Sequence, residues 1–301
     1  MLLYVVDSNG SSPGRVGFGM SVNSNAEMCG SIGGGIMEHK FVELAKEKLK
    51  ENPGFPQIRR QLHEAGAVKD RSGMICSGEQ TILLYHVKNE DLHEINKLLR
   101  SLNRNENGTL EISPSRIRFK QNEKSSETGF QFTSESEWLY REKTGHLVFA
   151  HIIGGGHCSL ALSGLLRSLD FYVRVYDERT GLKTMEENTS AHEKLVVSGF
   201  SELRDVIEGG KNNYAIIMTF GYRTDDIALR ALLGKGFEFL GVLGSRSKID
   251  TMFSTYRQEG ISEEVLSSIY SPVGLSINSQ TPVEIAVSIA AQIIKVKNER
   301  K

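Results

Sequence analysis

The chain has 301 residues, enough for two domains of ordinary size, each with its own hydrophobic core. Hydrophobic residues make up 39% of the sequence and charged residues 24%, which is the range of globular proteins. The formal net charge of -1 argues against nucleic acid or an acidic membrane surface as the main partner.

The beginning of the chain and its cysteines bear on where the protein works. "MLLYVVDSNGSS" predicts one short strand without the basic and apolar regions of a signal peptide, and no run reaches the roughly 18 apolar residues of a membrane span. Cys29, Cys76 and Cys158 are scattered, so they form neither a disulfide framework nor a paired zinc spacing. We therefore expect a cytoplasmic protein that does not enter the membrane.

Residues 1–143 predict an α+β domain. Strands are expected over residues 2–7, 15–23 and 79–87, because apolar residues there are continuous or alternate. The apolar spacing predicts helices over 36–49 and 90–102. The residues expected to face inward are Met37, Phe41, Leu44, Ala45 and Leu49 in the first helix, and Leu92, Ile95, Leu98, Leu99 and Leu102 in the second. Residues 103–143 are more polar and predict short strands joined by turns.

Residues 144–301 predict a second domain, in which strands and helices alternate. Strands are expected over 147–153, 171–177, 194–199, 214–220 and 237–244, with amphipathic helices between them. Apolar strands separated by amphipathic helices indicate a parallel sheet covered on both faces. The fold class we predict is therefore α/β, with an N-terminal α+β domain followed by a Rossmann-like, doubly wound domain.

The last predicted helix begins with a complete capping pattern. Thr281 stands at the N-cap, Pro282 at the first helical position and Glu284 at the third. Apolar residues then occur nearly all the way round the helix, so we expect it to be buried on more than one side, in the flank of the sheet or in a dimer interface. A homodimer is the oligomeric state that this pattern favours.

The stretch "IIGGGHCS" has the context of a dinucleotide-binding turn, because it follows a predicted strand and opens a helix. Gly154 and Gly156 occupy the first two glycine positions, with Gly155 between them, but Ser159 replaces the third glycine. His157 stands at the mouth of the predicted crevice, and Asp177 ends the next strand, where such folds bind a ribose. The stretch predicts either a nucleotide or phosphate site or a Rossmann scaffold whose site is empty or reused.

A second candidate lies in "GVLGSRSK", at the end of the fifth predicted strand. Ser245 is placed to cap the next helix, and Arg246 and Lys248 fall in its first turn. Cations there oppose the helix dipole, so they indicate either a bound anion or a solvated basic turn.

"CGSIGGGIMEHK" brings together Gly33, Gly34 and Gly35 in front of a helix without the Rossmann spacing. Such a turn predicts either a second anion site or a set of tight backbone corners. Glu38 faces a cofactor or belongs to the ordinary surface of the helix.

Several of these motifs together resemble one family. "GSSPGRVGFGM", "GSIGGGIMEHKFVE" and "GMICSGEQTILLY" are similar to the N-terminal domain of the XdhC/CoxI family, the xanthine dehydrogenase accessory proteins. "IIGGGHCSLALSGLLRSLDFYVRVYDER", "GVLGSRSKID" and "SPVGLSINSQTPVEIAVSIAAQII" resemble its C-terminal Rossmann domain. The resemblance spans nearly the whole chain.

The resemblance implies an accessory protein that binds molybdenum cofactor (molybdopterin), helps a cysteine desulfurase to sulfurate it, and delivers it to a xanthine dehydrogenase-type molybdenum hydroxylase. Cys76, in a "CSG" turn, is the first candidate for a molybdenum ligand or sulfur relay, and Cys29 is the second; an inert buried cysteine is the alternative. Cys158 is expected to pack in the core. Many family members carry a cysteine where this chain has Ile36, and histidines where it has Phe220 and Tyr222.

Two other functions remain open at this point. One is an NAD(P)-dependent oxidoreductase with a dinucleotide at Gly154–Ser159 and His157 or Tyr222 as proton donor. The other is an interaction module that keeps an unused Rossmann site. A complete xanthine dehydrogenase is excluded, since the chain is too short for that multidomain enzyme and lacks a four-cysteine iron–sulfur pattern. A non-catalytic cofactor carrier is the function we favour.

Overall fold

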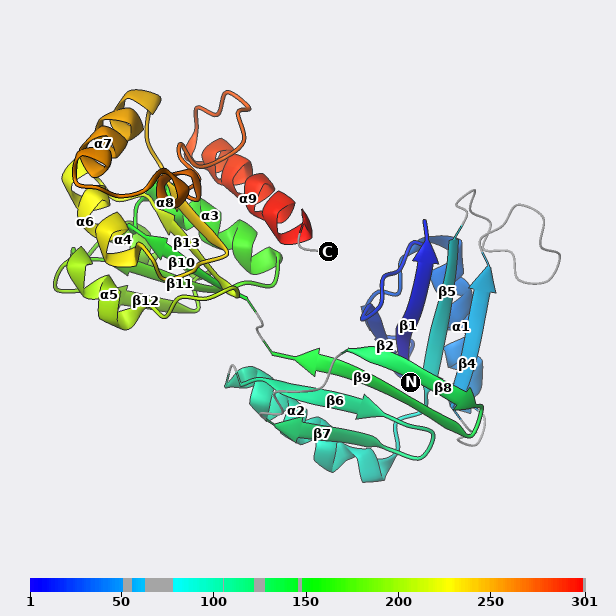
Figure 1. Ribbon diagram of the computed structural model, residues 1–301. Helices are drawn as coiled ribbons and strands as arrows, with labels where there is room; N and C mark the ends of the chain where they lie inside the picture. Colours follow the sequence, from blue (N-terminus) through cyan, green and yellow to red (C-terminus); the bar gives the residue numbers. More distant parts are fainter. Residues whose placement is uncertain (51–55, 63–77, 105, 122–127, 146–147, 300–301) are drawn as a thin grey trace. The chain divides into compact units, whose positions relative to one another are not determined.

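The computed structural model describes residues 1–50, 56–62, 78–104, 106–121, 128–145 and 148–299. Their internal contacts divide the chain into two compact units, Met1–Gly145 and His146–Lys301. Each unit has its own sheets and its own core, and each is described by itself (Figure 1).

The first unit contains a five-stranded antiparallel sheet in the order β3-β2-β1-β5-β4. Its strands are β1 (Leu2–Gly10), β2 (Gly19–Val22), β3 (Met28–Gly30), β4 (Gln57–Leu62) and β5 (Gly78–Tyr85). Helix α1 (Gly35–Lys50) covers one face, where Met37, Phe41 and Ala45 pack against Leu3 and Val5 of the central strand. The helical spacing predicted for this segment is confirmed.

Strand β2 is shorter than the sequence predicts. It begins at Gly19, because a turn closed by the Phe18 N–H and the Arg15 carbonyl precedes it, with Gly17 at a φ of +92°. Val16 and Phe18, expected inside a strand, are exposed in this turn.

A four-stranded antiparallel sheet, in the order β7-β6-β9-β8, lies against the other face of the first sheet. It consists of β6 (Gly108–Ile112), β7 (Ile117–Gln121), β8 (Gly129–Ser134) and β9 (Glu137–Thr144). Its apolar residues, among them Trp138 and Tyr140, form one core with Val6, Leu83 and Tyr85 of the first sheet.

Helix α2 (Leu92–Asn103) follows the short η1 turn (Asn89–Asp91), and it packs through fewer of its apolar residues than the sequence predicts. Ile95 and Leu98 pack into the core as expected. Leu92, Leu99 and Leu102 are instead exposed, which the sequence prediction had wrong. The helix is turned about its axis so that Glu94 accepts a hydrogen bond from the Phe119 N–H (2.8 Å), and those leucines lie outside the packed face.

The second unit is built on a parallel sheet in the order β12-β11-β10-β13-β14. The strands are β10 (Phe149–Ile153), β11 (Tyr172–Asp177), β12 (Glu193–Val196), β13 (Asn213–Ile217) and β14 (Phe239–Val242). The strand order reverses between β10 and β13, which is the point where open α/β sheets bind ligands. This confirms the Rossmann-like fold predicted for the second half of the chain.

Helices cover both faces of this sheet because successive strand residues alternate between two cores. Helices α3 (His157–Ser168), α4 (Lys183–Glu186) and α9 (Pro282–Glu299) pack on one face. The other face carries η2 (Phe200–Glu202), α5 (Leu203–Val206), α6 (Tyr222–Leu232), α7 (Arg246–Gln258) and α8 (Glu263–Ser267). The short helices α4 and α8 were not among the predicted elements.

The predicted capping pattern of the last helix is confirmed. The Glu284 N–H donates to Thr281 Oγ1 (3.2 Å), and the Thr281 N–H donates to the Glu284 carboxylate (3.1 Å). One side of α9 packs in the core beside α3, through residues such as Ala286 and Ile293.

Candidate functional site

The second glycine triplet forms the corner between β10 and α3, and its three glycines have different roles. Gly154 has a φ of +107°, and a Cβ there would lie 2.4 Å from the Met218 carbonyl oxygen. A Cβ on Gly155 would collide with the Met185 side chain, also at 2.4 Å. Gly154 therefore requires glycine for the close approach of the backbone, whereas a side chain at Gly155 would force the Met185 side chain to move.

Gly156 differs, because a Cβ there would meet nothing within 4 Å. It is the N-cap of α3, and no side chain caps the helix. The cap therefore supplies no side-chain acceptor for the amide groups of the first helical turn. These amides form the positive end of the helix dipole. An added side chain would fill the space from which an anion could reach these amides, so the corner fits a phosphate group.

Asp177, expected to read a ribose, is fully buried at the end of β11. Its carboxylate accepts hydrogen bonds from the Gly155 N–H (2.7 Å), from the Arg179 N–H (2.9 Å) and from the Arg179 guanidinium (2.8 Å to each oxygen). Burial alone would raise the pKa of Asp177, but these hydrogen bonds outweigh it and lower the pKa. Asp177 thus fixes the glycine corner and orients Arg179.

Arg179 is not among the residues predicted from the sequence, although it stands only two residues after Asp177, in "YDERT". Its guanidinium lies over the ring of Phe220, 4.8 Å from the centroid, and its side chain is 40% exposed. Phe220 follows the end of β13 and is itself 59% exposed. Arg179 therefore presents a cation at the carboxyl edge of the sheet, between the ends of β11 and β13.

The basic turn at the start of α7 separates into one paired and one unpaired cation. Ser245 caps α7 as predicted, accepting a hydrogen bond from the Lys248 N–H (3.3 Å). The Lys248 ammonium forms an ion pair with the fully buried Asp225 and donates to the Leu243 carbonyl (3.1 Å). Lys248 is thus explained by the fold, whereas the exposed Arg246 has no partner among the residues the structure describes.

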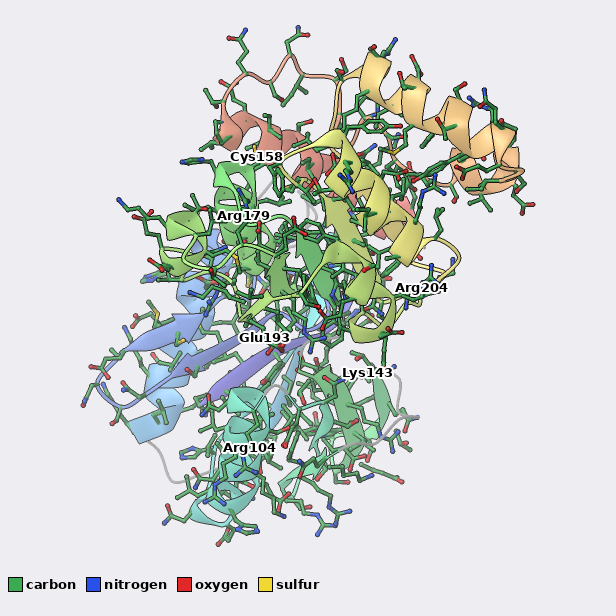
Figure 2. All side chains as sticks on the ribbon, turned by 90° about the vertical axis from the view of Figure 1, so that its left-hand side faces the viewer. Arg104, Lys143, Cys158, Arg179, Glu193 and Arg204 are labelled. Carbon is green, nitrogen blue, oxygen red and sulfur yellow. The ribbon has the colours of Figure 1, made fainter. Side chains whose placement is uncertain are left out.

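His157 and Cys158 are the first two residues of α3. His157 is exposed at the edge of the glycine corner. Cys158 is half-buried and packs against the core between α3 and the sheet (Figure 2). Burial raises the pKa of the Cys158 thiol, which disfavours the reactive thiolate and agrees with the expected packing role.

The first glycine triplet forms a different kind of corner, and its anion is already present. Gly33, Gly34 and Gly35 have φ values of +127°, +75° and +70°. The Glu38 carboxylate accepts hydrogen bonds from the Ile32 N–H (2.9 Å), the Gly34 N–H (3.0 Å) and the Ser31 hydroxyl (2.7 Å). Burial opposes ionisation, but these donors outweigh it and lower the pKa of Glu38. The chain therefore neutralises this turn with its own carboxylate.

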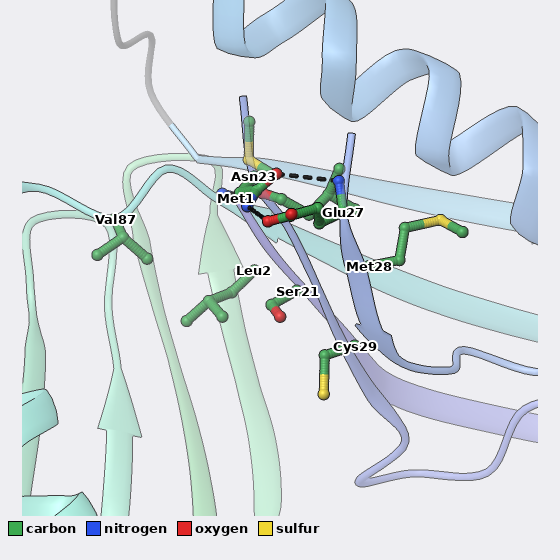
Figure 3. A pocket seen from close by; sticks show the side chains of 9 residues that line it. Met1, Leu2, Ser21, Asn23, Glu27, Met28, Cys29 and Val87 are labelled. Atoms are coloured by element: carbon green, nitrogen blue, oxygen red, sulfur yellow. Dashed lines mark hydrogen bonds between the residues drawn. The ribbon is translucent and has the colours of Figure 1, made fainter. Parts of the chain in front are cut away.

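Cys29 lies on the edge strand β3 of the first unit and is exposed. It pairs with Ser21, which pairs with Leu2, so these three side chains share one face of the sheet. A shallow hollow of about 400 Å³ begins there, lined also by Met1 and Val87 (Figure 3). The thiol is therefore accessible, in contrast to that of Cys158.

Cys76, the first candidate for a metal ligand, lies outside the described residues. Within the described parts of the chain, no three histidine, cysteine, aspartate or glutamate residues are grouped so that they could hold a metal ion. Among the described helices, none is long and apolar enough to span a membrane.

Comparison with protein families now bears on both units. Residues 150–293 match the XdhC Rossmann domain, and residues 1–59 match the XdhC and CoxI family. The chain belongs to the XdhC/CoxI family. In this XdhC/CoxI chain the glycine corner of α3, Asp177 and the basic turn fall in the first match, and the Glu38 turn falls in the second.

Two curated relatives match this XdhC/CoxI chain, and each match covers less than half of the relative. It is 25% identical over 298 residues to the uncharacterized protein YqeB of Escherichia coli K12, covering 99% of this chain and 43% of that protein. It is 27% identical over 146 residues to a probable xanthine dehydrogenase subunit of Bacillus subtilis 168, covering 48% of this chain and 42% of that protein. The chain thus spans less than half the length of YqeB, whereas the match to the xanthine dehydrogenase subunit takes in about half of this chain.

A solved structure supports the fold along the whole chain. The crystal structure of a xanthine dehydrogenase from Bacillus halodurans superposes with a TM-score of 0.77, covering all of this chain and 92% of that one. At 21% sequence identity, this similarity concerns the fold alone.

Proposed function

We propose that this protein is a carrier of molybdenum cofactor that serves a xanthine dehydrogenase-type molybdenum hydroxylase. The observation that carries the proposal is the uncapped start of α3, where Gly156 leaves the helix amides open to an anion. Molybdopterin ends in a phosphate, and we assign this corner as the binding site of that phosphate. When bound, the cofactor supplies the molybdenum and its dithiolene ligand, whereas the chain supplies the phosphate seat and the Arg179 cation.

An NAD(P)-dependent oxidoreductase is the alternative, and Asp177 argues against it. Recognition of NAD at such a site uses a carboxylate that is free to bind the ribose hydroxyls. Here Gly155 and Arg179 already bind both carboxylate oxygens. Binding of NADH to the pure protein, followed by hydride transfer to a small carbonyl compound, would favour the alternative over the carrier.

Sulfuration by a cysteine desulfurase is the second part of the proposal. An accessible thiol is needed if the chain accepts sulfur, and among the described residues Cys29 meets this condition better than Cys158. Cys76 stays a candidate for the relay or for a molybdenum ligand. Replacing Cys29 or Cys76 with serine should lower the yield of active hydroxylase without changing the melting temperature; normal yields from both variants would assign the sulfur chemistry to the desulfurase.

We also propose a cytoplasmic homodimer that pairs through α9. Val283, Val287 and Ile294 lie on the side of this helix away from the core, with exposed fractions of 62%, 46% and 39%. A self-associating surface would cover them. Sedimentation of the wild type should give a dimer and of Val287→Glu a monomer.

The carrier function can be tested by transfer. Protein isolated from a molybdate-fed host should activate a purified, cofactor-free molybdenum hydroxylase, and it should have no xanthine oxidation activity of its own. Turnover of xanthine by the isolated chain, or failure to activate the apoenzyme, would contradict the proposal.

A further inference from the structure

A carboxyl group inside the first unit is not explained by the site described above. Glu142 lies on β9, opposite Leu110 of β6, on the face that packs against the first sheet. It is partly buried, and no described lysine, arginine or histidine forms an ion pair with it. A carboxylate that is buried without a cation destabilises a fold, so its presence calls for another partner.

The neighbours of Glu142 are hydroxyl groups. Tyr140 precedes it on the same face of β9, and its ring lies 5.5 Å from that of Tyr4 on β1. Both tyrosines interact electrostatically with Glu142, and no other titratable group of the described chain has a comparable effect on it. Burial, only partly offset by the Tyr140 hydroxyl, raises the pKa of Glu142 to about 7.

Two hydroxyls on this face form no hydrogen bond of normal geometry with the described residues, although one of them, that of Tyr140, interacts with Glu142. The Tyr140 side chain is fully buried, yet no described atom completes a hydrogen bond of normal geometry with its hydroxyl. The same holds for Thr144 Oγ1, two residues beyond Glu142 on the same face. Buried polar groups are nearly always paired, so this row of three polar side chains has hydrogen-bonding capacity that the described residues do not use.

Gly17 borders one side of the row. The Cβ that Gly17 lacks would lie 3.7 Å from Glu142 Oε1, which is the only described atom outside the neighbouring residues within 4 Å of it, so there is space beside that oxygen. Phe18, next to Gly17, is 43% exposed and offers a ring beside the same turn. The site therefore combines a carboxylate, hydroxyl groups and aromatic rings, which suits a flat heterocycle with adjacent N–H donors.

We propose that Glu142, flanked by Tyr4 and Tyr140, binds the 2-amino-4-oxopyrimidine edge of a heterocycle. That edge carries a ring N–H next to an amino group, and the two donors match the two oxygens of a carboxylate. Pterins and guanine share this edge, and the proposed function favours a pterin. The inference rests on that function only for the identity of the heterocycle.

Matched pairs of free ligands test the edge. Neopterin should bind the wild-type protein about tenfold to a hundredfold more tightly than the corresponding pteridine-2,4-dione, which has an oxygen in place of the amino group. Guanosine compared with inosine provides the same test for guanine. Preference for guanosine over neopterin would identify guanine as the source of the edge.

Glu142→Gln should reverse the preference between the two pteridines, because an amide offers one acceptor and one donor, as the dione requires. Glu137→Gln, on the exposed face of the same strand, is the control and should behave like the wild type. The proposal is overturned if neopterin does not bind at about 1 mM, if the wild type does not discriminate between the pteridines, or if Glu142→Gln leaves the ratio unchanged.

These titrations use free pteridines and do not depend on loading of the molybdenum cofactor. If the protein retains molybdenum but Glu142→Gln has no effect on pteridine binding, the carrier function stands and this inference is wrong. If the protein discriminates between the pteridines but carries no molybdenum, this inference stands and the carrier function is wrong.

Discussion

The Glu38 carboxylate accepts a hydrogen bond from the Gly34 N–H (3.0 Å), so a side chain of α1 occupies the backbone turn that precedes the same helix. The first glycine triplet is therefore saturated by the protein itself, whereas the second, at the start of α3, is not. Two similar stretches of sequence thus have different chemistry.

Removing the carboxylate should expose the first turn to external anions. We expect Glu38→Ala to lower the free energy of unfolding by about 1 to 2 kcal/mol, because several donors lose their acceptor. Added sulfate should then raise the melting temperature of the variant more than that of the wild type. Equal sulfate effects on the two proteins would show that Glu38 does not fill an anion seat.

The three glycines of the second corner should respond differently to alanine. Gly156→Ala should change the free energy of unfolding by less than about 0.5 kcal/mol, because its Cβ meets open space. Gly154→Ala should lose about 2 kcal/mol or more, since its φ of +107° and the Met218 carbonyl oppose a side chain. Urea titrations measure both values. A large loss in Gly156→Ala would mean that this position is structural rather than open.

The two cations at the start of α7 should separate stability from binding. Lys248→Met leaves the buried Asp225 without its cation and should cost about 3 to 5 kcal/mol of unfolding free energy. Arg246→Ala removes an exposed side chain and should leave stability unchanged within about 0.5 kcal/mol. Arg246→Ala is therefore the variant of the two that is informative about anion binding. The amount of cofactor phosphate that the purified variant retains measures this binding.

Glu142 should make the stability of the protein depend on pH. Its pKa is about 7 in the folded protein and 4.5 ordinarily, so between these values the native state holds a proton that the unfolded state has released. The free energy of unfolding should consequently fall as the pH rises from 4.5 to about 7. Glu142→Gln removes this dependence and should gain stability relative to the wild type, by up to about 3 kcal/mol.

Urea unfolding of both proteins at about pH 5 and about pH 8 measures this difference. A difference in stability that stays constant between the two pH values would show that Glu142 has an ordinary pKa. It would also remove the argument that this carboxyl group is buried without a partner.

The Rossmann unit could be predicted largely from sequence, because its signals are local. Five apolar strands alternating with helices, the corner at Gly154 and Gly156, and the caps at Thr281 and Ser245 all depend on neighbouring residues. Such patterns are set by periodicity and by backbone sterics.

Pairings between distant residues could not be predicted in this way. Lys248 lies 23 positions from Asp225, and nothing in the basic turn indicates which carboxylate it meets. Glu38 is close in sequence to its turn, but only the three positive φ angles show that the chain folds back on it. For α2, the apolar spacing predicted the wrong packed face: Leu92, Leu99 and Leu102 are exposed. Glu94 instead accepts a hydrogen bond from the distant Phe119 N–H.

The molybdenum and pterin content of the protein purified from a molybdate-fed host tests the carrier function most directly. We expect near-stoichiometric molybdenum by mass spectrometry, together with the fluorescence of oxidised molybdopterin, in the wild type. Gly156→Val should fold normally and lose both, because its side chain blocks the approach to the α3 amides. A wild-type protein without molybdenum and pterin would contradict the carrier function, and a Gly156→Val variant that retains them fully would contradict the phosphate site at α3.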